Sequence, residues 1–139
     1  MEDFFDLPEG VSITYEDYMV ADSYPEDGGA DEYFALDASM GKKLLVLRFH
    51  LTNETEQEET IDLLNTNSRY IITVNDSVRA NALTTMLPND MSTYAETLEP
   101  GQTQELVLLL EINEDVAGAV QTIALRLKNA SNEYTIQLL

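Results

Sequence analysis

Gly41-Lys-Lys-Leu-Leu-Val-Leu-Arg-Phe-His-Leu-Thr-Asn53 contains the clearest β-strand pattern in this chain. Successive side chains of a β-strand point to opposite faces, so the stretch from Lys42 to Thr52 separates into two sets. One face is uniformly apolar and consists of Leu45, Leu47, Phe49 and Leu51. The other face is mixed and consists of Leu44, Val46, Arg48 and His50. This pattern predicts a long strand in a sheet that packs on one side.

A second segment, Leu98-Glu-Pro-Gly-Gln-Thr103, precedes a long apolar strand predicted from Glu105 to Ile112. Pro100 and Gly101 fit the two central positions of a type II turn, because proline presets φ and glycine accepts a positive φ. Shorter strands are predicted around these two, with turns between them, at residues 11–16, 60–64, 69–74, 78–85, 122–127 and 134–139. Residues 33–36 are either a short strand or the approach to the strand that begins at Lys42. About eight strands at this spacing predict an all-β, two-sheet antiparallel β-sandwich.

The composition is that of one acidic domain. The chain has 139 residues and a net charge of -19, and residues 1–41 hold 12 of its 26 acids and no base. We expect an acidic N-terminal arm over residues 1–10 and the sandwich over residues 11–139. Such a charge repels nucleic acid, and the sequence has no apolar stretch long enough to insert in a membrane. The absence of cysteine excludes disulfides, thiolate zinc sites and cysteine nucleophiles.

The best candidate for chemistry is the acidic loop from Asp22 to Glu32. Two glycines, Gly28 and Gly29, allow the loop to curl around an ion. Five carboxylates supply the hard oxygen ligands that calcium prefers, and they are Asp22, Glu26, Asp27, Asp31 and Glu32. The spacing is not that of an EF-hand, and a solvated acidic loop is the other interpretation. No other cofactor is expected.

Catalytic motifs are absent from the sequence. His50 is the single histidine, and neither an orienting acid nor a nucleophile is identifiable for it from the sequence. The chain has no Gly-x-Ser-x-Gly, no His-Glu-x-x-His and no phosphate-binding glycine loop. We therefore expect a protein that is not an enzyme. A hydrolase with a pair of convergent carboxylates is the remaining enzymatic alternative.

Three segments resemble the immunoglobulin-like domains of unknown function found in secreted lipoproteins of Gram-positive bacteria. They are the glycine, apolar strand and terminal Asn of 41–53, the proline–glycine turn of 98–103, and the closing strand pair 123–127 and 134–139. The resemblance extends from about residue 11 to the end. It implies an immunoglobulin-like sandwich that is exported and held at the membrane by a lipidated cysteine upstream of this chain. The acidic arm over residues 1–10 would then be the remnant of a tether. The resemblance supplies no catalytic residues.

Two functions follow as expectations. The first is a non-enzymatic extracellular or cell-envelope module that binds an unknown protein or other envelope component, as a monomer or weak dimer. The alternative is a calcium-binding or cation-stabilised surface domain that uses the loop 22–32.

Overall fold

The computed structural model describes residues 1–24 and 36–139. Two helices of one turn, α1 (Glu2–Phe5) and α2 (Glu114–Ala117), and two 3-10 helices, η2 (Leu64–Thr66) and η3 (Met91–Thr93), accompany the strands. The strands are β1 (Val11–Ala21), β2 (Ser23–Tyr24), β3 (Leu36–Asp37), β4 (Lys42–Asn53), β5 (Glu59–Asp62), β6 (Arg69–Val74), β7 (Val78–Asn81), β8 (Ala95–Leu98), β9 (Thr103–Asn113), β10 (Ile123–Lys128) and β11 (Glu133–Gln137).

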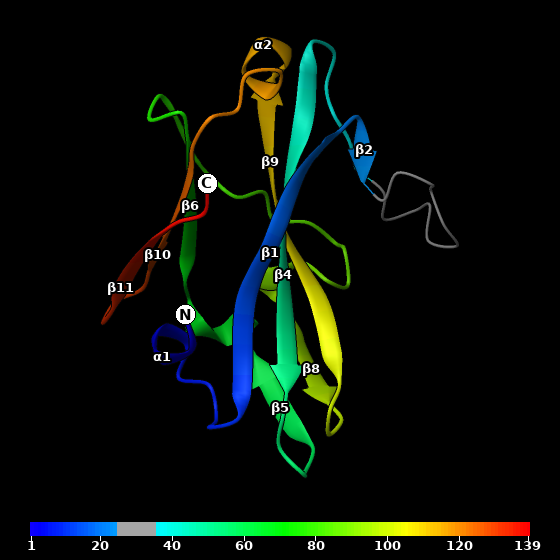
Figure 1. Ribbon diagram of the computed structural model, residues 1–139, viewed down its shortest axis with the longest axis vertical. Helices are drawn as coiled ribbons and strands as arrows, with labels where there is room; N and C mark the ends of the chain where they lie inside the picture. The colour runs from blue at the N-terminus through cyan, green and yellow to red at the C-terminus, as the bar shows by residue number, and fades with distance from the viewer. Residues whose placement is uncertain (25–35) are drawn as a thin grey trace.

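Two main sheets make up the sandwich. One has the order β1-β4-β9 and the other the order β11-β10-β6-β7, and every strand pair in them is antiparallel. Two small sheets, β2-β3 and β5-β8, lie at the periphery. Figure 1 shows the long strands β1, β4 and β9 along the longest axis, with β6, β10 and β11 beside them. The predicted all-β sandwich is confirmed.

The main core lies between the two sheets. β4 is the central strand of its sheet, and its apolar face is fully buried, as the alternation predicted: Leu45, Leu47, Phe49 and Leu51 are all 0% exposed. These side chains share one cluster with the inner residues of β6 and β10, which are Tyr70, Ile72, Val74, Ile123, Leu125 and Leu127. Burial of this continuous apolar surface is the main stabilising contribution to the fold.

A second, smaller cluster lies on the opposite face of β4. It consists of Leu44, Val46, Leu87, Val107 and Leu109. The cluster covers only the first half of β4, so Arg48, His50 and Thr52 in the second half stay partly exposed. The mixed face of β4 is thus divided into two halves. The loop that contains Leu87 covers the apolar half, and the polar half faces solvent.

The first strand contains a β-bulge. Tyr15 pairs with Phe49 and Asp17 pairs with Arg48, so Glu16 is an extra residue in β1. The extra residue reverses the alternation of side chains, so Tyr15 and Tyr18 both pack against the main core. Glu16 and Asp17 instead reach His50 and Arg48 on the outer face. β1 extends to Ala21, whereas the sequence predicted a strand that ends at residue 16. The prediction stopped there because the bulge interrupts the alternation of apolar and polar residues.

The N-terminal residues are anchored to this sheet. Phe4 and Phe5 of α1 are 6% exposed and belong to the main core. The Glu2 carboxylate accepts a hydrogen bond from the backbone N–H of Ile13 in β1, at 3.1 Å. The division of the chain at residue 10 stays a prediction. No helix among the described residues is long and apolar enough to cross a membrane.

Asn53 joins the two segments that the sequence singled out. Its backbone N–H donates to the carbonyl of Gln102, and its carbonyl accepts from Gly101, at 2.9 and 2.7 Å. Its side chain is fully buried and donates to the carbonyls of Gln57 and Leu98, at 2.9 and 3.2 Å. Gly101 has a φ of 76°, the positive value that the proline–glycine turn requires.

Candidate functional site

The predicted calcium loop lies mostly outside the described residues. Glu26, Asp27, Asp31 and Glu32 fall within residues 25–35, and only Asp22 is described. Asp22 is exposed, and its carboxylate forms an ion pair with the ammonium group of Lys43 at the start of β4. Within 1–24 and 36–139, no group of three or more His, Asp and Glu side chains could hold a metal ion. The calcium hypothesis stays a prediction.

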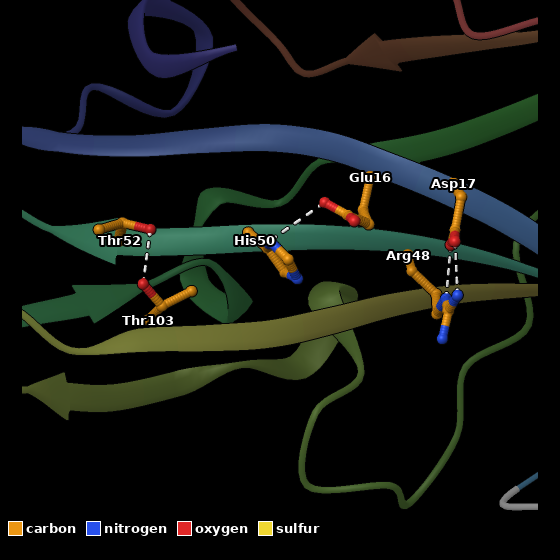
Figure 2. A network of polar contacts seen from close by, with 6 residues as sticks. All are labelled: Glu16, Asp17, Arg48, His50, Thr52 and Thr103. Atoms are coloured by element: carbon orange, nitrogen blue, oxygen red, sulfur yellow. Dashed lines mark hydrogen bonds and ion pairs between the residues drawn. The ribbon is translucent and has the colours of Figure 1, made fainter.

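A different set of polar side chains comes together on the outer face of β1-β4-β9. We call this set the polar strip. It comprises Thr14, Glu16, Asp17, Arg48, His50, Thr52, Thr103 and Glu105. Figure 2 shows six of them, contributed by the three neighbouring strands. The strip lies beside the smaller apolar cluster, on the half of the sheet face that no loop among the described residues buries.

An ion pair between Asp17 and Arg48 forms one end of the strip. The guanidinium donates two hydrogen bonds to the carboxylate, from Nε to Oδ1 and from Nη2 to Oδ2, both at 2.5 Å. This fork geometry is characteristic of arginine–carboxylate recognition. The hydrogen bonds from Arg48 lower the pKa of the Asp17 carboxyl, and the same contact raises the pKa of Arg48. Both side chains are therefore charged at neutral pH.

His50 occupies the middle of the strip. Its Nδ1 lies 3.3 Å from the Glu16 carboxylate, and the bulge in β1 brings that carboxylate within reach (Figure 2). Glu105 stands opposite His50 in the register of β4 and β9, and Thr14 stands opposite it in the register of β1 and β4. The imidazole therefore lies between Glu16 on β1 and Glu105 on β9.

The far end of the strip consists of two hydroxyl groups. Thr52 and Thr103 are directly opposite each other, and their Oγ1 atoms are 3.0 Å apart (Figure 2). These hydroxyls hydrogen-bond to each other, whereas the imidazole contacts Glu16. A nucleophilic hydroxyl would have to be hydrogen-bonded to its base. The arrangement suits mixed-charge recognition by a partner surface better than acyl transfer.

The strip rests on a well-packed layer. The ring of Tyr15 packs edge-on against Phe49, with ring centres 5.5 Å apart. Burial raises the pKa of Tyr15 to about 12, with a smaller contribution from the charge of Asp17. The phenol of Tyr15 is thus uncharged at neutral pH. The backbone of three paired strands fixes the spacing of the polar side chains above it.

Sequence reasoning placed Arg48 and His50 on one face but missed their partners. Glu16 and Asp17 lie about thirty residues away in the chain, on a strand whose register no local pattern determines. The available signal was the spacing of Tyr15 and Tyr18. Two aromatic residues three positions apart cannot share one face of a regular strand, and a bulge resolves this conflict.

Comparisons with known proteins show the fold and no activity. No protein-family model and no curated protein sequence matches this chain. It superposes with a TM-score of 0.59, at 15% identity, on an uncharacterized beta-sandwich protein from Clostridium difficile 630, over 96% of this chain and 88% of that one. A conserved hypothetical protein from Bacillus anthracis gives 0.54 at 12% identity, over 95% and 89%. The chain is thus similar in fold to uncharacterised proteins of Gram-positive bacteria.

Proposed function

We propose that this chain is a non-enzymatic binding module of the cell envelope that recognises a protein partner through the polar strip. The observation that carries the proposal is the alignment of eight polar side chains from three neighbouring strands on one exposed sheet face. Carboxylate side chains alternate with basic side chains along this face, from Asp17 and Arg48 to Glu16 and His50. Such alternation selects a partner of complementary charge and fixes its orientation.

The rigidity of the strip supports recognition. β4 is hydrogen-bonded on both sides, and the ion pair of Asp17 with Arg48 holds two of the side chains in place. A surface that is ordered before binding loses less conformational entropy when the partner arrives. The residues are also on strands instead of loops, which keeps their mutual distances constant.

The proposed location is the outside of the cell, with a lipid anchor at a cysteine upstream of this chain. The resemblance of segments 41–53, 98–103 and 123–139 to domains of secreted lipoproteins supports it. Labelling the producing organism with an alkyne-bearing fatty acid tests it. Lipid label on the protein in the membrane fraction is the expected result, and unlabelled protein confined to the cytosol would contradict the location.

A charge swap tests the role of the polar strip. The double variant Asp17→Arg with Arg48→Asp preserves the net charge and the ion pair. It exchanges the positions of the positive and the negative charge on the sheet. The matched control is the double variant Asp22→Lys with Lys43→Asp, which swaps an exposed ion pair outside the polar strip. Chemical cross-linking in envelope extracts should yield one set of partners for the natural protein and the control, and lose it in the strip variant. Identical partners for all three proteins would refute the assignment of the strip.

The non-enzymatic nature of the module is tested separately. A panel of chromogenic esters, phosphate monoesters and glycosides covers the hydrolase alternative. The expected result is no turnover above that of buffer. Turnover that His50→Ala or Glu16→Gln abolishes, with the fold intact by circular dichroism, would overturn the proposal and make the strip an active site.

A further inference from the structure

Most of the few cations of this acidic protein gather on one surface. The chain has seven Lys and Arg residues. Four of them lie on the outer face of the sheet β11-β10-β6-β7, and we call this surface the basic face: Arg69, Arg79, Arg126 and Lys128. Their neighbours along β6, β7 and β10 pack in or against the main core, so strand alternation directs these side chains outward. One carboxylate, that of Glu133 on β11, shares the face.

The cations of the basic face are poorly compensated. Arg126 pairs with Glu133 at 2.9 Å. Arg69, Arg79 and Lys128 form no ion pair with any described residue, although Glu133 stands opposite Lys128 in the register of β10 and β11. Arg69 even stands directly opposite Lys128 in the register of β6 and β10, and like charges at such positions destabilise a sheet. In a chain with 26 acids, this arrangement is not due to a shortage of carboxylates.

A hollow between two of these arginines lies at the edge of the sheet. It has a volume of about 220 Å³ and is lined by Arg69, Ile71, Arg79, Ala80 and Asn81. Ile71 forms an apolar floor that is 6% exposed, and the two guanidinium-bearing side chains flank it. An apolar floor between cationic walls suits a carboxylate on a short aliphatic stem, such as a glutamate side chain.

The edge strand beside this hollow has an open side. β7 pairs with β6 alone among the described strands. The N–H of Ala82 donates to the carbonyl of Tyr70 at 2.8 Å, so Ala82 belongs to a hydrogen-bonded pair of the ladder. Such pairs alternate along an antiparallel ladder, which directs the backbone groups of Arg79 and Asn81 away from β6. A strand that is added there would find free donors and acceptors.

We infer that an extended acidic polypeptide segment adds to the edge of β7 and places carboxylates at alternate positions on Arg79 and Arg69. Alternate residues of the added strand share one face, as the arginines and the hollow require. A short acidic segment fits better than nucleic acid or another long polyanion, which the net charge of -19 repels. The inference concerns a surface separate from the polar strip and goes beyond the proposed function.

Fluorescence anisotropy with a labelled octapeptide of alternating glutamate and valine tests this inference. The intact protein should bind it, and should not bind the matched peptide of alternating glutamine and valine. Arg69→Ala and Arg79→Ala should each weaken binding roughly 10- to 100-fold, the range expected for hydrogen bonds to a charged group. Lys42→Ala removes the same charge from an exposed site on the other sheet and should change affinity by less than about twofold, as expected for a distant surface charge.

Two further measurements make the result decisive. Hydrogen exchange should show protection of the Arg79 and Asn81 amides when the glutamate–valine peptide binds. Equal binding of both peptides, wild-type affinity in Arg69→Ala, or an absence of this protection would each overturn the inference. Tighter binding of polyphosphate than of the peptide would assign the face to phosphate polymers instead. The swap of Asp17 and Arg48 should leave peptide binding unchanged, so failure of one proposal is distinguishable from failure of the other.

Discussion

Asn53 is a single side chain that holds two distant parts of the sandwich together. Its amide donates to the carbonyls of Gln57 and Leu98, and its Oδ1 accepts from the backbone N–H and the hydroxyl of Thr55, at 2.9 and 2.6 Å. The asparagine at the end of the long strand and the proline–glycine turn are therefore parts of one hydrogen-bonded unit. The sequence contained both features but not their contact.

Asn53→Ala should lower the free energy of unfolding by about 2–3 kcal/mol, because it leaves buried donors and acceptors without partners. Urea unfolding measures the change. Asn132→Ala is the control, since Asn132 is exposed and should change stability by less than about 0.5 kcal/mol. An Asn53 variant as stable as this control would mean that water replaces the lost contacts.

The pair of Asp17 and Arg48 predicts a pH-dependent contribution to stability. Hydrogen bonding to Arg48 lowers the folded-state pKa of Asp17 below its ordinary value of 3.8. The contribution is thus fully present well above pH 3.8 and is lost as the pH falls through the lower, folded pKa. A double-mutant cycle with Asp17→Asn and Arg48→Met should give a favourable coupling at pH 7 and a smaller one at pH 2. Equal coupling at both pH values would contradict the assignment.

At the scale of elements, the bulge in β1 is the feature that builds the polar strip. Deletion of Glu16 should leave a regular strand in which Tyr15 and Tyr18 still face the core and Asp17 still faces Arg48. We expect the melting temperature to change by less than roughly 5 °C. Deletion of Thr14 should lower it by roughly 10 °C or more, because Val11 and Ile13 would turn from the core to solvent. Circular dichroism measures both melting temperatures. An equal decrease for the two deletions would contradict the assignment of Glu16 as the extra residue of a bulge.

The long strands and several of the short ones were predictable, and the predicted strand over residues 69–74 is β6, Arg69–Val74. The strand predicted over residues 42–52 extends over Lys42–Asn53, and the one predicted over 105–112 extends over Thr103–Asn113, because alternating leucines determine both. β8 was missed, since its single buried residue, Leu98, gives no pattern. The strand predicted over residues 78–85 ends at Asn81, because the N–H of Leu83 bonds to Leu109 of the other sheet. A change of hydrogen-bonding partner from one sheet to the other depends on tertiary structure, and the local sequence gives no pattern for it.

At the scale of the whole molecule, the net charge of -19 governs the response to cations. Asp22 already pairs with Lys43, and general screening acts on the acids of the whole surface. We therefore expect millimolar calcium to raise the melting temperature no more than the same concentration of magnesium, at 150 mM salt. A rise of roughly 5–10 °C with calcium but not with magnesium, the size expected at a hundredfold excess over Kd, would instead support the loop 22–32 as a metal site.

The pairing of β4 has a consequence for the order in which the chain folds. In this sheet Val11 pairs with Asn53, and Lys42 pairs with Asn113, so each partner strand is distant in the chain. Contacts of such high contact order form slowly, on a scale of milliseconds to seconds, whereas the hairpins β6-β7 and β10-β11 close locally. β4 leaves the ribosome long before β9 exists to pair with it. One edge of β4 therefore stays without a partner until synthesis reaches residue 113, so the sheet β1-β4-β9 is completed late in translation.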